Sequence, residues 1–329
     1  TFSQLAHITN IPNFSVNFSA ATVVEGTIFI GTEKNGLFST ALSNPTVFEN
    51  LSPNGPVRNY IFRVKKAPNY LWAVYGDYTR DYNPYALDEF GISKFSTDNG
   101  WELIPYNDLF QAKSISDIVI NPNNPNQVYA TSYFSGLLKI ENENIELFNN
   151  TNTGPNGLES LVVPGSPSYV DIRINSPAFD KDGNLWLTNA FVDKAIKVLR
   201  SNGQWQSYNL ADVAPTASTG RYGPMAIDKN RTKWIPTLND GLIAFNENYN
   251  NKFIVVNSIN GNLADNDVRC VAVDNRNQLW IGTYAGLRTV SVDRFISSDE
   301  LTTNAIIIQE GDLAQELFYQ QTILDIAVD

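Results

Sequence analysis

Residues 274–283 read DNRNQLWIGT, and the short turn after them leads into Gly286 and Leu287. Two other segments follow the same plan: DKDGNLWLT at 180–188 and DKNRTKWIPT at 228–237. In all three, Asp precedes Trp by six residues, and the three Trp positions are 48 and 46 residues apart. Self-similarity at this period is typical of propeller and solenoid architectures, so we interpret the chain as a repeat.

Weaker copies of the segment occur upstream. FIGT at 29–32 is followed by Gly36, LW at 71–72 is followed after an insertion by Gly91, and VYAT at 128–131 is followed by Gly136. The aromatic residue of each copy recurs at intervals of 43 to 57 residues. It marks six repeats, at Phe29, Trp72, Tyr129, Trp186, Trp234 and Trp280.

Each repeat has the pattern of four short strands separated by Asn, Asp and Gly turns. In the last full repeat we expect strands at 268–273, 278–283, 286–292 and 305–309. Four strands in about 45 residues correspond to one blade of a β-propeller. No amphipathic helix of three turns is predicted, and the best helical candidates are the short segments 298–301 and 312–319.

The predicted fold is therefore all-β, a β-propeller with six complete four-stranded blades plus the first strand of a seventh. The strand pattern ILDIAVD at 323–329 supplies that last strand, so we expect residues 1–329 to be part of a longer chain. The expected blades are residues 18–59, 60–113, 114–168, 169–222, 223–266 and 267–322, with 323–329 starting a further one.

The repeated motif residues are expected to be structural. The Asp ends a strand and accepts backbone N–H groups in the next turn, while the large Trp ring fills the wedge between blades. We assign this role to Trp72, Asp180, Trp186, Asp228, Trp234, Asp274 and Trp280.

The composition excludes several kinds of chemistry. The 329 residues contain one Cys and one His, which excludes an internal disulfide, a CxxC zinc site and a multi-histidine metal site. The net charge of −11 and the absence of a Lys/Arg run argue against nucleic acid as a partner. No stretch approaches 18 consecutive apolar residues, so this segment should have no membrane span. We expect no metal and no cofactor.

The motif D-x-x-G/N-x-L-W-I-G-T-x-x-G-L resembles the two-component-regulator propeller repeat. The match is good at 180–188 and 274–287 and partial at 228–242. That family forms the periplasmic sensor regions of hybrid two-component systems in Bacteroidetes. The resemblance implies an oligosaccharide-sensing propeller, which is the alternative function.

A closer resemblance covers most of the chain. Together with the blades, residues 2–13, 298–308, 312–319 and 323–329 resemble the surface propeller proteins of the type IX secretion system. The resemblance implies a non-enzymatic accessory of protein export at the outer-membrane surface or in the periplasm. It also implies secretion-system or cargo proteins as partners and binding of lipopolysaccharide or glycan.

An insertion in the second repeat, residues 75–90, contains four tyrosines, one arginine and several carboxylates. Aromatic faces suit sugar rings, and binding sites concentrate in loops on a rigid scaffold. We therefore expect Tyr78, Arg80, Tyr82 and Tyr85 to contribute to a ligand-binding surface. The alternative is that these tyrosines pack the loop onto a neighbouring blade.

A second long loop, residues 209–222, ends with Arg221 and Tyr222, which we add to the candidate ligand-binding residues. Arg221 would pair with an anionic ligand, and the alternative is a solvated loop. Arg63, Arg173 and Arg269 fall on expected innermost strands, where they would hold an anion or bond neighbouring carbonyl groups. The turn at Asp180 and Asp182 resembles the Asp-box of sialidases, but no catalytic arginine triad can be assigned, so we predict no catalytic residues.

Overall fold

A computed structural model describes residues 7–52 and 54–328, and the chain divides into two compact units, Thr1–Gly55 and Pro56–Asp329. The first unit holds one antiparallel sheet in the order β1-β2-β3-β4. Its apolar core comprises Ile11, Ile28, Ile30 and Phe38. The strands are β1 (Phe18–Val24), β2 (Thr27–Thr32), β3 (Leu37–Ala41) and β4 (Asn44–Asn50).

The second unit contains further antiparallel meanders of the same kind, four of them with four strands. The first is β5 (Arg63–Lys66), β6 (Leu71–Val74), β7 (Ile92–Ser96) and β8 (Gly100–Ile104). The second is β9 (Ile115–Asn121), β10 (Asn124–Phe134), β11 (Gly136–Glu141) and β12 (Asn144–Phe148). The third is β13 (Ile172–Phe179), β14 (Leu185–Asn189), β15 (Ile196–Leu199) and β16 (Trp205–Tyr208).

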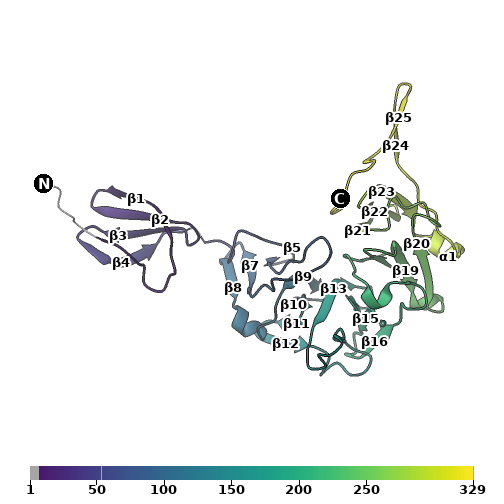
Figure 1. The fold of residues 1–329 in the computed structure, drawn as a ribbon, viewed down its shortest axis with the longest axis horizontal. Coiled ribbons are helices and arrows are strands. Elements are labelled where there is room, and N and C mark those ends of the chain that lie inside the picture. Colours follow the sequence, from purple (N-terminus) through teal and green to yellow (C-terminus); the bar gives the residue numbers. More distant parts are fainter. Residues whose placement is uncertain (1–6, 53, 329) are drawn as a thin grey trace. The chain divides into compact units, whose positions relative to one another are not determined.

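A fourth four-stranded meander and a three-stranded sheet complete the series in the described residues (Figure 1). The former is β17 (Ala226–Ile227), β18 (Lys233–Pro236), β19 (Leu242–Asn246) and β20 (Lys252–Val256). The latter is β21 (Val268–Val273), β22 (Gln278–Thr283) and β23 (Gly286–Ser291). Short 3-10 turns lie at η1 (Tyr106–Leu109), η2 (Ala217–Thr219) and η3 (Glu247–Tyr249).

The first strands of successive sheets in this unit are spatial neighbours. Strand β5 lies beside β9, β9 beside β13, β13 beside β17, and β17 beside β21. Strand β10 runs on to Phe134 and pairs there with β13, which joins two neighbouring sheets. First strands that neighbour one another in succession are the arrangement of propeller blades, and we number these five sheets blades two to six in chain order.

The buried core lies between the faces of successive blades. Trp186 of blade four shares one cluster with Phe245 of blade five, and Trp234 of blade five shares another with Phe295 beyond blade six. A sheet of this kind buries its apolar face only against its neighbour, so the stability of the ring depends on contacts between repeats.

Blade six departs from the expected four-strand pattern. Asn304 makes a single bridge to Thr289, and the strand expected at 305–309 instead forms β24 (Ile307–Glu310). It pairs with β25 (Leu313–Glu316) in a hairpin whose turn includes Gly311 at φ 59°. The helical turn expected at 312–319 is therefore wrong because β25 occupies it. A helical turn, α1 (Arg294–Ser297), precedes the other predicted segment, 298–301, which is not helical.

The predicted first strand of a seventh blade is not formed in the described residues 323–328. The segment lies against blade six: the Ile323 N–H donates to the Thr283 carbonyl at 3.0 Å, and the Thr322 hydroxyl donates to the Tyr284 carbonyl at 2.9 Å. Residue 329 and residues 1–6, which the predictions included, lie outside the described residues. Over the described ranges, no helix has the length and apolar character that a membrane span requires.

Candidate functional site

The insertion of blade two runs from β6 to β7 and reaches across to four other blades. The Tyr78 ring stacks on Tyr82 with centroids 4.9 Å apart and lies 4.9 Å from the ring of Tyr133 in blade three. The amide of Asn175, in blade four, donates to the Tyr78 hydroxyl at 3.1 Å. Farther along, the Arg80 carbonyl accepts from the Arg269 guanidinium in blade six at 2.6 Å. The insertion therefore packs on the ends of the innermost strands.

Several of the predicted ligand-binding tyrosines are packing residues in this arrangement. Tyr82 is 4% exposed and Tyr222 is equally buried, while Tyr78 is half-buried between Tyr82 and Tyr133. The Tyr222 carbonyl accepts from the same Asn175 amide at 2.8 Å. Burial raises the pKa of both Tyr78 and Tyr222. The burial of Tyr82 agrees with the alternative interpretation of the insertion, in which its tyrosines pack on a neighbouring blade, whereas the alternative for the loop of Tyr222 was a solvated loop.

The inward-facing arginines are neutralised by aspartates. Arg173 bonds Asp171 at 2.8 Å, Arg269 bonds Asp267, and the Arg63 Nε lies 3.4 Å from an Asp117 oxygen. Burial raises the pKa of Asp117, which opposes the effect of the Arg63 charge. Since each cation has a carboxylate partner, these three arginines do not form the free anion site that their positions suggested.

Arg80 is the exposed cation of the insertion. Its side chain is 57% exposed, and the guanidinium carbon lies 3.8 Å from the ring centroid of Tyr284, just after β22. A guanidinium nitrogen lies 3.7 Å from Asp267, which also pairs with Arg269, so one carboxylate faces two cations and a net positive charge remains. A cation held over an aromatic ring and kept at the surface can still meet an anionic group.

Arg221 is the second cation at this end of the molecule. Its guanidinium carbon lies 5.2 Å from the ring centroid of Phe191, which Arg173 also approaches at 4.8 Å. Among residues 7–52 and 54–328, Arg221 has no carboxylate partner in an ion pair. It is half-buried, so its charge remains available to solvent and to a ligand.

Exposed aromatic rings lie beside these cations. Tyr85 is 48% exposed, and its hydroxyl forms a hydrogen bond with the hydroxyl of Tyr169, which also donates to Asp171 at 3.3 Å. Both rings contact Phe134 edge to face, with centroids 6.4 Å apart. Sequence reasoning missed Tyr169 and Tyr284, because they occupy ordinary loops whose neighbours are distant in the chain.

These residues share one end of the blades. Tyr85 and Tyr284 follow second strands, whereas Tyr169 and Arg221 precede first strands. In an antiparallel pair, the end of one strand and the start of the other meet at the same edge. We define this set, Arg80, Tyr85, Tyr169, Arg221 and Tyr284, as the loop-end surface.

The repeated Asp and Trp residues lie at the opposite end of the blades. The Trp indole Nε1 donates to the Asp Oδ2 in three blades: Trp186 to Asp180 at 2.8 Å, Trp234 to Asp228 at 2.9 Å and Trp280 to Asp274 at 2.9 Å. The other oxygen accepts two backbone N–H groups of the turn. In blade two, Trp72 is buried beside Tyr70 with ring centroids 5.9 Å apart. The described residues contain no cluster of three His, Cys, Asp or Glu side chains that could hold a metal ion.

Comparison with known proteins supports the propeller fold. Residues 262–285 match the family model described as two component regulator propeller. PorZ, a surface component of the type IX secretion system of Porphyromonas gingivalis, superposes with a TM-score of 0.76 at 20% identity over 93% of this chain. The extracellular domain assigned to hybrid two component system BT3049 of B. thetaiotaomicron superposes with a TM-score of 0.53 at 15% identity over 94% of this chain.

The chain spans 43% of the PorZ chain and 39% of the BT3049 chain. No curated protein matches it in sequence. The fold is thus a β-propeller, in which residues 262–285 match the two-component-regulator propeller model. PorZ is one of the solved propellers whose fold this chain resembles, in agreement with the resemblance predicted from the sequence motifs.

Proposed function

We propose that this chain is a non-enzymatic, extracytoplasmic accessory of type IX secretion, either at the outer-membrane surface or in the periplasm. The fold shared with PorZ supports this assignment. The propeller would act as a scaffold that holds loops in fixed positions for contact with secretion-system or cargo proteins.

We further propose that the loop-end surface binds an anionic glycan such as lipopolysaccharide. The observation that carries this proposal is the pair of surface arginines, Arg80 and Arg221, flanked by the exposed rings of Tyr85, Tyr169 and Tyr284. A guanidinium pairs well with phosphate or carboxylate groups, and a tyrosine ring offers an apolar face with a polar tip to a sugar.

The test uses lipopolysaccharide from Porphyromonas gingivalis immobilised on a sensor surface. The double variant Arg80→Ala with Arg221→Ala should bind at least about tenfold more weakly, because each charge-assisted contact contributes about 1.5 to 3 kcal/mol. Arg231→Ala is the matched control, since Arg231 is an exposed arginine at the opposite end that pairs with Asp182 at 2.8 Å. Equal binding by the double variant and the wild type would count against the surface.

The second candidate function is an oligosaccharide-sensing propeller of a hybrid two-component regulator. The match of residues 262–285 to that propeller family favours it. The gene sequence downstream of codon 329 separates the two functions. A transmembrane helix followed by a kinase supports the sensor, whereas a β-sandwich sorting domain supports secretion.

A further inference from the structure

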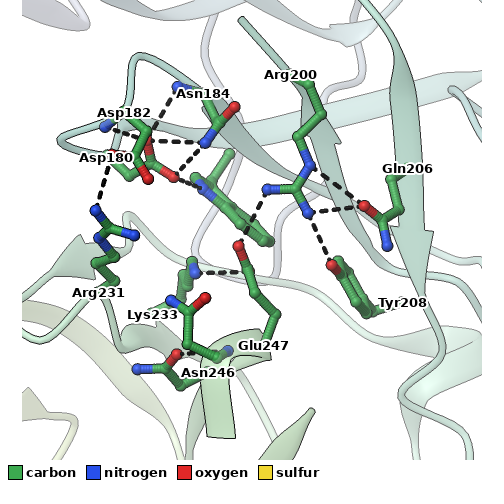
Figure 2. Close-up of polar contacts among 12 residues, drawn as sticks. Asp180, Asp182, Asn184, Arg200, Gln206, Tyr208, Arg231, Lys233, Asn246 and Glu247 are labelled. Carbon is green, nitrogen blue, oxygen red and sulfur yellow. Dashed lines mark hydrogen bonds and ion pairs between the residues drawn. The ribbon is translucent and has the colours of Figure 1, made fainter. Parts of the chain in front are cut away.

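The interface between blades four and five is filled by a set of large side chains. Different side chains occupy the equivalent positions at the interface between blades three and four. The Lys233 Nζ lies 3.7 Å from the ring centroid of Trp186 and donates to Glu247 at 2.8 Å. Phe245 contacts the same Trp186 ring edge to face at 6.1 Å. Figure 2 shows Glu247 between Lys233 and Arg200, with Arg200 extending to Gln206 and Tyr208. These side chains fill the space between the two blades, and we call this the closed interface.

Strand register identifies the equivalent positions one blade earlier. Trp186 is opposite Val198, and Leu185 is opposite Leu199, just as Trp234 is opposite Ala244 and Lys233 is opposite Phe245. Leu185, Leu199 and Ser201 therefore occupy in blade four the positions of Lys233, Phe245 and Glu247 in blade five. In blade three Tyr129 takes the place of Trp186, since it is opposite Val119 as Trp186 is opposite Ala178. Asn121, two residues after Val119, takes the place of Asp180, and its side-chain oxygen likewise accepts the N–H two residues farther on.

Three of these replacements, Tyr129 for Trp186, Leu199 for Phe245 and Ser201 for Glu247, remove volume from the interface between blades three and four. A phenol replaces an indole, two leucines replace a lysine and a phenylalanine, and a serine replaces a glutamate. The result is a cleft of about 510 Å³, which lies within the range of small-molecule sites. We call it the interblade cleft. Its lining from blade three is Asn121, Asn123, Gln127, Tyr129, Lys139 and Phe148, opposite Phe179, Gly183, Leu185, Leu199 and Ser201 of blade four, among others.

The cleft combines aromatic rings with amide groups. Tyr129 and Phe179 meet edge to face at 5.9 Å, and Phe148 adds a third ring. The Asn123 amide reaches the opposite wall so closely that a Cβ on Gly183 would lie 2.8 Å from its Nδ2. Tyr129 is 7% exposed, yet among the described residues its hydroxyl has no hydrogen-bond partner. A hydroxyl that no protein group bonds and that lines an open cleft can donate to and accept from a polar ligand there.

The charges of the cleft select the class of ligand. Lys139 lies 3.4 Å from Glu141 and 3.6 Å from Glu146, and Arg200 pairs with Glu247 at 3.0 Å. Both cations are therefore already compensated, and an anionic ligand would gain little from them. Amide groups, which both donate and accept, complement neutral hydroxyl groups.

We propose that the interblade cleft is a binding site for a neutral saccharide of one or two pyranose rings. The Tyr129, Phe148 and Phe179 rings would contact the apolar faces of the sugar. The Asn123 amide and the Tyr129 hydroxyl would bond its hydroxyl groups. The Asn121 and Gln127 amides bond each other at 2.7 Å and would contribute only their remaining donor and acceptor sites. The site is separate from the loop-end surface and selects ligands of different charge.

The test is saturation-transfer NMR of the chain with maltose, cellobiose, mannobiose, lactose and N,N′-diacetylchitobiose, followed by titration calorimetry. At least one disaccharide should bind with a Kd below about 10 mM, a weak but measurable affinity. Leu199→Phe, which installs the residue of the closed interface, should weaken that binding at least about tenfold. Tyr129→Phe should weaken it about fivefold through loss of one hydrogen bond. Tyr249→Phe, an exposed tyrosine of blade five outside the cleft, is the matched control and should bind as the wild type does.

Ser201→Tyr provides a second blocking variant from an exposed position at the cleft, should Leu199→Phe fail to fold. Absence of binding by all five sugars, or undiminished binding after blocking, would overturn the proposal. The Arg80→Ala, Arg221→Ala double variant should keep disaccharide binding. If this double variant loses lipopolysaccharide binding but still binds the disaccharide, the interblade cleft and the loop-end surface bind their ligands independently.

Discussion

The indole Nε1 of Trp186 donates to Oδ2 of Asp180 at 2.8 Å, six residues earlier in the chain. The carboxylate thereby links a turn at the end of one strand to the ring that fills the space before the next blade. The same link recurs at Asp228 with Trp234 and at Asp274 with Trp280. Its repetition explains why these two residue types, six apart, mark the repeat.

Trp186→Phe should lower the free energy of unfolding by about 1 to 3 kcal/mol, because Asp180 loses a buried charge-assisted hydrogen bond. Urea denaturation followed by circular dichroism measures this. Trp205→Phe is the control, since Trp205 is half-buried, packs on Phe148 and has no carboxylate partner among the residues that the structure describes. An equal loss of unfolding free energy in both variants would mean that the volume of the ring, and not its hydrogen bond to Asp180, determines the stability.

Asp274 should titrate below the ordinary aspartate range, because the indole of Trp280 and turn N–H groups stabilise its ionised form and lower its pKa. A folded-state pKa below the unfolded one means that this carboxylate stabilises the fold above the unfolded pKa. That contribution disappears as the pH falls through the folded pKa. Trp280→Phe should move the pKa upward, as followed by carboxyl carbon NMR. An unchanged pKa would contradict the assignment.

Asp228 should behave oppositely although it makes the same bonds. Burial is the largest influence and raises its pKa above the usual value. In the NMR titration Asp228 should therefore protonate at a higher pH than Asp274 as acid is added. Its burial opposes folding once the carboxyl group ionises, so this site loses stability as the pH rises through its folded pKa. The reverse order of titration would show that hydrogen bonds outweigh desolvation at both sites.

Lys233→Met should destabilise the junction of blades four and five by about 1.5 to 3 kcal/mol, because the hydrogen bond from Lys233 to the Glu247 carboxylate is lost. Lys233 is fully buried between Trp186 and Glu247. Chemical denaturation of this variant, of Glu247→Gln and of the double variant gives the coupling energy. Lys229→Met is the control: Lys229 lies 3.7 Å from Asp293 with both side chains more than half exposed, and its loss should cost below about 1 kcal/mol. A coupling energy near zero would show that Lys233 and Glu247 do not stabilise each other.

Tyr82→Ala should cost about 3 to 5 kcal/mol because it opens a cavity beneath the insertion. Tyr85→Ala, three residues away on the exposed side, should cost less than about 1 kcal/mol and reduce glycan binding instead. Thermal unfolding and lipopolysaccharide binding measured on both variants separate the two roles. Similar effects of the two substitutions on stability would contradict the packing of Tyr82.

The local spacing of Asp, Trp and Gly was enough to predict an all-β propeller and the four-strand plan of its repeats. That plan failed where a competing local pairing was available. Residues 307–310 meet the strand 313–316 through a tight turn at Gly311, and this hairpin takes the place of a fourth strand beside β23. Strand patterns specify which residues are extended, but not which neighbour an edge strand selects.

The candidate sites were less accessible to sequence reasoning. Composition singled out the tyrosine-rich insertion and Arg221, yet Tyr82 and Tyr222 are buried, whereas Tyr169 and Tyr284 reach the surface. The interblade cleft left no sign in any single repeat. The cleft depends on how Tyr129, Leu185 and Leu199 differ from their equivalents at the closed interface between blades four and five.

The sequence by itself therefore determined the repeat, the strands and the turn residues, because these depend on interactions within about ten residues of the chain. Only the tertiary structure decided which tyrosines are buried, which arginines are neutralised and where two blades leave a cleft. Those properties depend on side chains that face one another from different repeats, such as Arg80 and Tyr284, and the relation between them is set by packing around the propeller axis.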